Sequence, residues 1–319
     1  MTSLEQLLTS HFGARVTEIA SRPSLYCSSF FVNEIDVRLD DGTTVALVAK
    51  AAQWEAKSSD AQRAKPGFLW DEQRERTTYE SILAALDLNS AQYFGSYTDA
   101  SGVHYLLLER IPGIRLWECG DFESWRAAAR WLARLHGQVS ADTAMASTAG
   151  PHLLRYDRQF YESWMTRAQR FHVADDDVNR LATCHARVVD RLLEERPAFL
   201  HGEFYSENIL VESQAGAVAV RPVDWEMAAF GPALMDLACL VAGEWNDDER
   251  ADMTDAYLGE LATAGFESPR REEYLQTLDC CLFHLSIQNL GWSDAWTPPP
   301  DRAHDWLGEA VRLCEKWKL

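Results

Sequence analysis

The pattern of apolar residues changes once along this chain of 319 residues, close to residue 113. Before that point, residues 30–50 hold two runs rich in Val, Ile and Leu on either side of Asp41 and Gly42. This dipeptide suits the positive φ angles of a tight β-hairpin turn. After that point, apolar residues recur mostly at the three- and four-residue spacing of amphipathic helices. The change predicts an α+β fold with two lobes, a small β-rich one and a larger, mainly helical one.

The first predicted lobe covers residues 1–112 and has the element order strand, strand, helix, strand, strand. Its helix is expected within residues 69–88, which combine dense charge with a helical spacing of apolar residues. Strand-like runs follow at residues 91–98 and 103–111. The polar stretch that follows the first hairpin, up to about Gly67, separates it from the helix.

The second predicted lobe covers residues 113–319 and is mainly helical. Residues 122–137 place apolar side chains on one face and end at a glycine, as helices often do. Further helical patterns run through residues 157–171, 177–195, 232–244, 249–264, 270–290 and 303–318. Residues 208–224 are instead expected to form strands, as a small hairpin within the helical lobe.

Charge and hydropathy argue against two broad classes of function. The chain has 30 Lys and Arg against 49 Asp and Glu, a formal net charge of −19. Because a nucleic-acid-binding surface needs Lys and Arg to displace counterions, nucleic acid is not expected as a partner. No stretch approaches the roughly 18 apolar residues of a membrane span, and the N-terminus has no basic leader. The expectation is a cytoplasmic protein with no membrane partner and no evident protein partner.

Three polar residues flank the predicted hairpin. In "HGEFYSEN", Glu203 and Asn208 stand five residues apart, and Asp224 follows sixteen residues later in "VDWE". Phosphoryl transfer needs an acidic side chain for the proton of the substrate hydroxyl, and amide and carboxylate oxygens that hold Mg²⁺ against the phosphates. The pattern assigns the first role to Glu203 and the second to Asn208 and Asp224. Taken singly, Asn208 and Asp224 also suit turns and helix caps.

The same loop resembles that of the aminoglycoside phosphotransferase and choline kinase-like family. The family loop reads His-Gly-Asp with Asn five residues after the Asp, and an Asp-Trp or Asp-Phe pair follows. The resemblance covers nearly the whole chain, since "ARWLARLHG" and "GPALMDLACL" are similar to two further family segments. It implies a two-lobed protein kinase-like fold with ATP and Mg²⁺ as cofactors. It also implies nucleotide binding by residues 1–112, and catalysis and substrate binding by residues 113–319.

Two motifs of the first lobe gain a role from this resemblance. "VALVAK" looks like the family strand with the phosphate-pairing lysine, here Lys50. "RERTTYESIL" is similar to a family helix, which implies Glu75 as the ion-pair partner of that lysine. Without the resemblance, Lys50 is a lysine at a strand end and Glu75 an ordinary helix charge. Glu72 and Glu80 lie close by and are alternatives to Glu75.

The resemblance also implies how the nucleotide is held. "LLLERIPG" looks like the hinge, in which the backbone carbonyl of Glu109 and the backbone amide of Ile111 bind the adenine edge. Residues 20–30 lie where a loop that covers the nucleotide is expected, but they contain no glycine. Ser28 and Ser29 are the candidate phosphate donors in that loop.

One position departs from the family pattern, because Glu203 stands where the family has aspartate. Glutamate keeps the charge but reaches one methylene farther, and a misplacement of about 1 Å can cost about a hundredfold in rate. It can still act as a base if the loop is set back to compensate. We therefore expect an active kinase, and the alternative is a catalytically impaired nucleotide-binding pseudokinase or regulator. His201 and Asp236 are interpreted as supporting residues of the loop.

The acceptor is expected to be a small molecule with a hydroxyl. Gly202 replaces the arginine that pairs with a phosphorylated activation loop in many protein kinases. Only eleven residues separate Asp224 from Asp236, which leaves little room for a peptide-docking segment. The acidic excess suits a cationic acceptor such as an aminoglycoside-like antibiotic, although acidity spread over the surface for solubility explains it equally well.

Two sequence features point to different acceptors. Residues 244–249, "EWNDDE", offer carboxylates for a polyamine sugar, whereas Trp292 and Trp296 suit a bulkier apolar compound such as a macrolide. Both sets also fit ordinary surface and core positions. The sequence therefore leaves the acceptor, and the preference for ATP or GTP, open.

Overall fold

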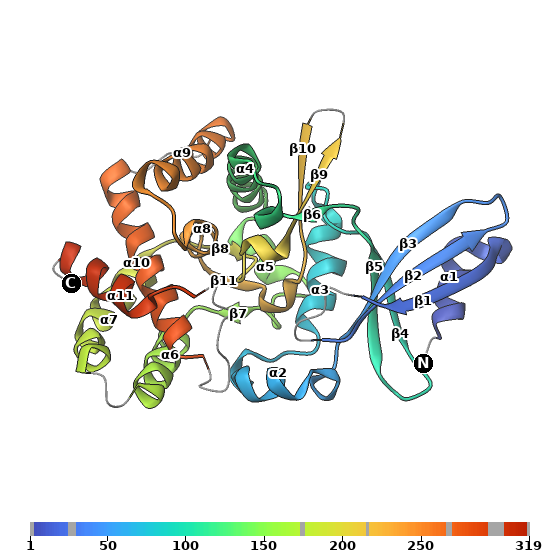
Figure 1. The fold of residues 1–319 in the computed structure, drawn as a ribbon, viewed down its shortest axis with the longest axis horizontal. Helices are drawn as coiled ribbons and strands as arrows, with labels where there is room; N and C mark the ends of the chain where they lie inside the picture. The colour runs from blue at the N-terminus through green and yellow to red at the C-terminus, as the bar shows by residue number, and fades with distance from the viewer. Residues whose placement is uncertain are drawn as a thin grey trace.

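The protein forms two lobes, with a β-sheet lobe at one end and a larger helical lobe at the other (Figure 1). The computed structural model describes residues 3–24, 30–172, 176–214, 217–265, 270–292 and 303–317. The N-terminus lies in the β-sheet lobe and the C-terminus at the far side of the helical lobe (Figure 1). The α+β architecture predicted from the single change in apolar pattern is confirmed.

The small lobe is built on an antiparallel sheet with the strand order β1-β2-β3-β5-β4. These strands are β1 (Val16–Pro23), β2 (Val32–Leu39), β3 (Thr44–Ala51), β4 (Tyr93–Thr98) and β5 (His104–Glu109). The predicted turn at Asp41 and Gly42 joins β2 to β3, and Gly42 has the positive φ of 83° that suits it. Helix α1 (Leu4–Phe12), which the sequence pattern did not predict, packs Leu7 and Leu8 into the core of this sheet.

Helix α3 (Arg74–Ser81) lies between the sheet and the helical lobe (Figure 1). It is shorter than the predicted span of 69–88, because residues Leu83–Ala85 form a separate 3₁₀ turn. Glu75 and Tyr79 on this helix are buried, although its sequence is dominated by charged and polar residues. The helix therefore directs polar side chains into the interior, where the two lobes meet.

The connection from β3 to α3 is more structured than the predicted polar stretch. It contains the short helix α2 (Ser59–Ala64) between two 3₁₀ turns, Trp54–Ala56 and Gly67–Leu69. The side chain of Ser58 caps α2 by accepting a hydrogen bond from the N–H of Ala61. This connection lies beside the helical lobe (Figure 1).

The helical lobe contains every helix that the sequence predicted, with ends shifted by a few residues, and one short helix more. Its helices are α4 (Phe122–Gln138), α5 (Ala141–Ala146), α6 (Arg158–Phe171), α7 (Asp176–Glu194), α8 (Leu234–Val241), α9 (Asp247–Thr263), α10 (Arg271–Leu290) and α11 (Trp306–Trp317). Helix α5 is the one that was not predicted. In the described part of the chain, no helix is long and apolar enough to cross a membrane.

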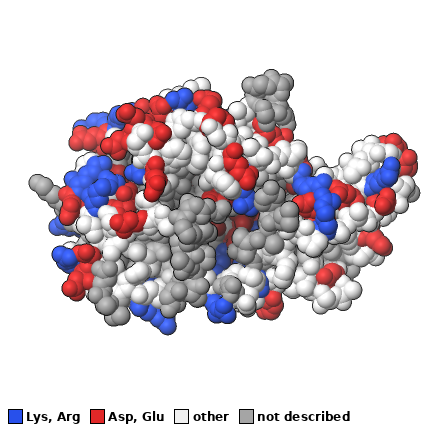
Figure 2. Space-filling model, viewed as in Figure 1, with Lys and Arg blue, Asp and Glu red and all other residues white. Residues whose placement is uncertain are grey.

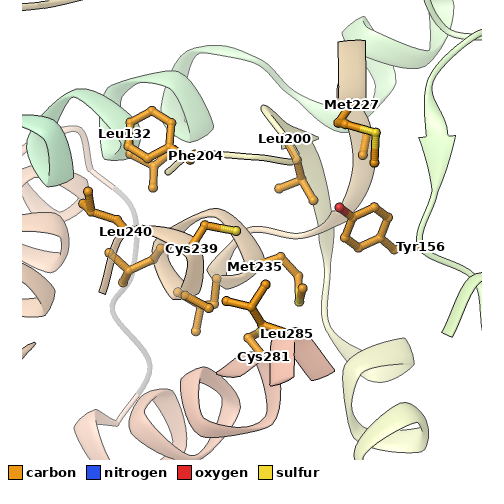
Figure 3. Close-up of a cluster of buried hydrophobic side chains, with 14 of the residues drawn as sticks. Leu132, Tyr156, Leu200, Phe204, Met227, Met235, Cys239, Leu240, Cys281 and Leu285 are labelled. Atoms are coloured by element: carbon orange, nitrogen blue, oxygen red, sulfur yellow. The ribbon is translucent and has the colours of Figure 1, made fainter. Parts of the chain in front are cut away.

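Helix α8 is buried along its whole length. Figure 3 shows Met235 and Cys239 of this helix close to Leu285 of α10, with Phe204 nearby. Such burial is expected of a helix that is apolar on every side. Asp236 is the exception, because it is a carboxylate with no exposed surface in an apolar core.

Two small sheets hold the segments on either side of the predicted polar cluster. The first has the order β10-β9-β6, with β6 (Ile114–Arg115), β9 (Ile209–Gln214) and β10 (Ala217–Pro222). The second has the order β7-β11-β8, with β7 (Leu154–Arg155), β8 (Pro197–Leu200) and β11 (Ala229–Pro232). The hairpin of β9 and β10 agrees with the strands predicted over 208–224. Residues 201–208 thus connect β8 to β9, and Asp224 follows β10.

Acidic and basic side chains are interspersed on the face shown in Figure 2. The described residues form many surface ion pairs, such as Arg158 with Asp190 at 2.6 Å. Exposed pairs of this kind contribute little to stability. This face therefore has no extended patch of acidic residues alone, despite the net charge of −19.

Candidate active site

A cavity of about 490 Å³ lies between the β-sheet lobe and the helical lobe. Lys50 on β3 and Glu75 on α3 line it from one side, and Asn208 and Asp224 line it from the other. Its size lies within the range of about 300–1,000 Å³ that is common for small-molecule sites. Four side chains to which the sequence analysis gave a role therefore share one cavity.

The ammonium group of Lys50 lies between two carboxylates. Its Nζ atom is 2.7 Å from Oε2 of Glu75 and 2.5 Å from Oδ1 of Asp224. Burial acts to lower the pKa of Lys50, but the carboxylates of Asp224 and Glu75 raise it well above its usual value. Glu80, one of the alternatives to Glu75, instead pairs with Arg76 at 2.6 Å. Lys50 is thus a permanently charged group in the cavity wall.

Two buried polar atoms of the cavity wall lack a partner. Oε1 of Glu75 and the hydroxyl of Tyr79 make no hydrogen bond within the described residues. Burial raises the pKa of Glu75 to about 7, although Lys50 opposes this shift. Since buried polar groups are normally hydrogen-bonded, these two atoms indicate that the cavity takes up water or a polar ligand.

Asp224 occupies a strained position at the end of β10. Its φ and ψ angles are 68° and 64°, in the left-handed region that residues other than glycine rarely adopt. Its Oδ1 atom is held by Lys50, whereas Oδ2 has no hydrogen bond within the described chain. Backbone strain of this kind is tolerated where a side chain must be aimed at a particular point.

The segment that begins at His201 is held by the buried carboxylate of helix α8. Oδ2 of Asp236 accepts the N–H of His201 at 2.7 Å, and Oδ1 accepts the N–H of Gly202 at 2.8 Å. Gly202 has a φ of 87°, and a side chain there would collide with the carbonyl of Met227. A glycine is therefore required at this position.

The His201 side chain joins this segment to the strand that leads to Asp224. Burial lowers the pKa of His201, so the ring is neutral near pH 7. Its Nε2–H donates to the carbonyl of Val223 at 3.0 Å, which leaves Nδ1 to accept the N–H of Glu203 at 3.3 Å. His201 and Asp236 thus fix the backbone of the loop, as the sequence interpretation expected.

Glu203 and Asn208 lie close together in the same loop. Nδ2 of Asn208 donates to the backbone carbonyl of Glu203 at 3.0 Å, so that Oδ1 of the amide is left without a hydrogen bond in the described structure. The Glu203 carboxylate is half-buried and makes no hydrogen bond or ion pair with any described residue. Burial raises its pKa to about 7, while Lys65 opposes the shift and Glu226 adds to it. Among the described residues that line the cavity, Glu203 is not included.

The predicted hinge residues also line the cavity. The Glu109 carboxylate does not face a ligand, because it accepts hydrogen bonds from Arg221 at 2.6 and 2.8 Å. The backbone N–H of Ile111 has no hydrogen-bond partner within the described residues and is available to a ligand. Ser28 and Ser29, the predicted phosphate donors, lie outside the described residues.

The sequence interpretation missed a second cluster of charges next to Asp224. Nζ of Lys57 lies 3.1 Å from Oε2 of Glu226, and Nζ of Lys65 lies 2.8 Å from Oε1 of the same residue. All three side chains are buried. A sequence signal was present, since Glu226 follows Asp224 by two residues, but nothing in the polar stretch before α3 singled out the two lysines.

Two of the described residues considered for the acceptor make contacts of their own elsewhere. Glu249 caps helix α9, where its carboxylate accepts the N–H of Asn246 at 3.0 Å. Trp292 packs against Trp164, with ring centroids 5.4 Å apart, and Trp296 lies outside the described residues. Trp225 is fully buried and stacks on Phe199, so it packs in the core.

The cavity offers two oxygens suited to a hard divalent cation. Oδ2 of Asp224 and Oδ1 of Asn208 are both without partners among the described residues, and both residues line the cavity. Oxygen ligands from carboxylate and amide groups suit Mg²⁺, which keeps several water ligands and also binds substrate phosphates. No group of three His, Cys, Asp or Glu side chains suited to a metal is found in the described part of the chain. The two oxygens therefore fit a cation that arrives together with a phosphate ligand.

Comparison with known proteins identifies a matching family and similar solved structures. The family described as "Phosphotransferase enzyme family" (APH) matches residues 50–274. None of the curated proteins matches the chain. The family match begins at Lys50 and includes Glu75, Glu203, Asn208 and Asp224.

Three solved structures illustrate the similarity in fold. The GDP complex of wild-type aminoglycoside 2'-phosphotransferase-IIIa has 13% sequence identity and a TM-score of 0.56, and the match covers 98% of this chain and 96% of that one. Choline kinase from Cryptosporidium parvum has 10% identity and a TM-score of 0.56 over 94% and 88% of the two chains. An aminoglycoside phosphotransferase from Streptomyces rimosus, in complex with ADP and streptomycin, has 17% identity and a TM-score of 0.51 over 91% and 97%. At these identities, the comparisons establish the shared two-lobed kinase-like fold.

Proposed function

Because the chain belongs to the phosphotransferase enzyme family and is therefore a phosphotransferase that acts on an alcohol group, we propose that it transfers the γ-phosphoryl group of ATP to a hydroxyl of a small, cationic acceptor. An aminoglycoside-like antibiotic is an acceptor of this kind, which would make the protein a resistance enzyme. The observation that carries the proposal is the position of Lys50 between Glu75 and Asp224, in a cavity that Asn208 also lines.

The proposed nucleotide site uses groups of the cavity wall. Lys50 binds the α and β phosphates, and Glu75 holds its ammonium group in position. The carbonyl of Glu109 and the N–H of Ile111 bind the adenine edge, which is supported by the free amide of Ile111 in the described structure. Ser28 and Ser29 remain proposed phosphate donors. In this proposal, residues 1–112 bind the nucleotide, and residues 113–319 provide catalysis and the acceptor site.

The proposed metal ligands are the two cavity oxygens without partners, Oδ2 of Asp224 and Oδ1 of Asn208. When bound, Mg²⁺ would neutralise developing charge on the phosphates. The hydrogen bond from Nδ2 of Asn208 to the carbonyl of Glu203 fixes the amide group and leaves Oδ1 for the metal. The left-handed backbone at Asp224 aims its carboxylate into the cavity.

Glu203 is the proposed base for the acceptor hydroxyl. Two properties support this role, namely that its carboxylate has no partner among the described residues and that burial raises its pKa to about 7. A base is most effective when its pKa lies near the operating pH. Backbone hydrogen bonds to His201 and Asp236 hold the loop in place, so the backbone position of Glu203 is fixed.

One observation favours the alternative of a nucleotide-binding protein with impaired catalysis. Glu203 is not among the described residues that line the cavity, whereas Asn208 and Asp224 are. If the carboxylate cannot reach the acceptor, the protein binds nucleotide without efficient transfer. Both hypotheses predict nucleotide binding, but only the proposed function predicts efficient phosphoryl transfer.

The test of the proposed function measures binding and turnover separately. ADP and GDP release from Mg·ATP and Mg·GTP is followed with aminoglycosides, macrolides, choline-like amino alcohols and sugars. Nucleotide affinity is measured by calorimetry in the same buffer. ADP release that depends on an aminoglycoside supports the proposal, and nucleotide binding without release for any acceptor supports the alternative.

A further inference from the structure

The connection from β3 to α3 brings two lysines to the carboxylate of Glu226. Lys57 and Lys65 stand just outside the two ends of helix α2, so this short helix fixes their separation. Their ammonium groups lie 3.1 and 2.8 Å from the two oxygens of Glu226. The three side chains are termed the lysine triad below.

The lysine triad is anchored to both lobes. Nη1 of Arg74, at the start of α3, donates to the backbone carbonyl of Glu226 at 2.8 Å and to that of Leu69 at 2.7 Å. The backbone of Lys57 forms an antiparallel bridge with Phe30, which lines the cavity. The triad therefore has a defined position relative to the cavity wall and to Asp224, two residues before Glu226.

Stability alone is a poor reason for this arrangement. The exposed fraction is 0% for the Lys57 side chain, 7% for Lys65 and 9% for Glu226. Removing such charges from water is costly, and well-packed apolar residues in place of a buried ion pair often give equal or greater stability. A second lysine on an already paired carboxylate adds a further cost of this kind. The position of the triad beside the candidate active site suggests another reason.

The lysine triad has one positive charge in excess, since two ammonium groups share one carboxylate. Oε2 of Glu226 contacts the ammonium group of Lys57 and Oε1 contacts that of Lys65, so one carboxylate serves both cations. Burial lowers the pKa of Lys57 to about 8, which still leaves it largely protonated at pH 7. The excess charge is therefore present under ordinary conditions.

This excess charge lies close to the proposed phosphate site. Nζ of Lys57 is 3.5 Å from the ring centroid of Phe30, and Nζ of Lys50 is 5.4 Å from the same centroid. Both ammonium groups thus lie within 5.4 Å of the centre of a ring that lines the cavity. Lys65 and Lys57 also interact electrostatically with Glu203, the proposed base. Charges in such a buried setting are weakly screened by solvent.

We infer that Lys57 and Lys65, held by Glu226, act as positioning residues that supply positive charge for the terminal phosphate of the nucleotide. The inference rests on the proposed function, because it assumes that a nucleoside triphosphate binds in this cavity with its phosphates near Lys50 and Asp224. The two lysines do not touch the phosphate but act through the electrostatic field of the triad. A fixed field of this kind favours the additional negative charge of a triphosphate over a diphosphate, and the charge that develops during transfer.

The prediction concerns the ratio of two binding constants, that of a triphosphate analogue and that of a diphosphate. A unit charge about 10 Å away, at an effective dielectric constant of about 20, changes this ratio by about tenfold. The probes are Mg·ADP and the Mg complex of the β,γ-imido analogue of ATP, which is not turned over. Lys65→Met and Lys57→Met are each expected to lower the preference for the triphosphate analogue by about tenfold. In both variants the remaining lysine still neutralises Glu226, so the fold is expected to persist.

Three further variants make the test specific. Lys65→Arg keeps the charge and should keep the preference. Lys316→Met removes a lysine from a surface pair with Asp279 on the far helices, and should leave both affinities unchanged. Glu226→Gln removes the negative charge of the triad and also the carboxylate that raises the pKa of Lys57, so this variant is compared with the wild type at pH 6. With both ammonium groups protonated, the triad gains one unit of positive charge and the preference for the triphosphate analogue should rise. This opposite sign decides the matter even if both lysine variants fail to fold.

The outcomes separate this inference from the proposed function. If the wild-type protein binds both nucleotides and all the triad variants keep the same ratio, the inference is wrong and the proposed function stands. If the wild-type protein binds neither nucleotide, both are wrong. A fall of the ratio in the methionine variants, together with a rise in Glu226→Gln, supports the inference, since a purely structural role would not reverse the sign.

Discussion

Nζ of Lys50 donates a hydrogen bond to Oδ1 of Asp224 across 2.5 Å, although the two residues are 174 positions apart in the chain. This contact joins the central strand of the small lobe to the end of the β9-β10 hairpin in the helical lobe. The same ammonium group lies 2.7 Å from Glu75. One lysine therefore contacts carboxylates from both sides of the cavity.

Replacement of this lysine should remove the nucleotide site. In Lys50→Met, two carboxylates of the cavity wall lose their shared cation and repel the phosphates. Loss of one partner from a buried, hydrogen-bonded charge pair weakens binding by about a hundredfold. Calorimetry with Mg·ATP checks this, with Lys316→Met as a control that removes a lysine from the surface. Unchanged affinity in Lys50→Met would contradict the assignment of this cavity to the nucleotide.

Gly202 should not tolerate a side chain. Its φ is 87° and an added Cβ would collide with the carbonyl of Met227, so Gly202→Ala must displace the loop that carries Glu203. We expect the free energy of unfolding to fall by about 3 kcal/mol and the activity to be lost. Gly42 is a matched control, because it has a φ of 83° but nothing within 4 Å of an added Cβ. Gly42→Ala should cost only about 1 kcal/mol and leave activity intact. Equal costs in chemical denaturation would show that the contact with Met227 has no effect.

Asp236 should stabilise the loop through two backbone hydrogen bonds. In Asp236→Asn, one oxygen becomes an NH₂ group that faces the N–H of His201 or Gly202 instead of accepting from it. A buried donor left unsatisfied costs about 2 kcal/mol of unfolding free energy. Asp255→Asn, at a half-exposed surface pair with Arg271, should change stability by less than about 0.5 kcal/mol. Denaturation of the two variants side by side tests the difference, and equal stabilities would mean that the buried carboxylate is not needed to hold the loop.

Acid should destabilise the helical lobe through His185. This histidine on α7 is buried, and burial lowers its pKa to about 4. Between pH 4 and the usual histidine pKa of about 6.5, the unfolded chain binds a proton that the folded protein does not, so stability falls as the pH falls. At pH 5 the loss from this one group is about 2 kcal/mol.

The matched experiment for His185 compares denaturation at pH 7.5 and pH 5. His185→Leu should lose less stability between the two values than the wild-type protein. The exposed histidine on α1 provides the control, since His11→Gln should lose as much as the wild-type protein. An identical pH dependence in wild type and His185→Leu would rule out this histidine as a cause of acid destabilisation.

Much of the architecture follows from local sequence signals. The turn at Asp41 and Gly42 and the helices after residue 113 were predicted because apolar spacing and turn residues act over short distances. Helix α1 and strand β1 were missed. Strand β1 was missed because most of its residues face solvent and show no regular alternation of apolar and polar side chains.

The candidate site was predictable only in part. Lys50, Asn208 and Asp224 belong to short motifs, and the structure brings them to one cavity. The lysine triad was not foreseen, because the pairing of Lys57 and Lys65 with Glu226 depends on the path of the chain between β3 and α3. Such a path is set by tertiary packing and leaves no periodic pattern in the sequence.

The central claim is that Glu203 supports phosphoryl transfer in place of aspartate. The most direct measurement is acceptor-dependent ADP release from Mg·ATP by the wild-type, Glu203→Asp and Asp224→Asn proteins in parallel. We predict that the wild-type protein releases ADP with at least one aminoglycoside, and that Asp224→Asn releases none. In Glu203→Asp the rate of release should be at least about tenfold lower, because the shorter side chain no longer reaches the hydroxyl. A wild-type protein that binds nucleotide but releases no ADP with any acceptor, while Glu203→Asp gains activity, would contradict it.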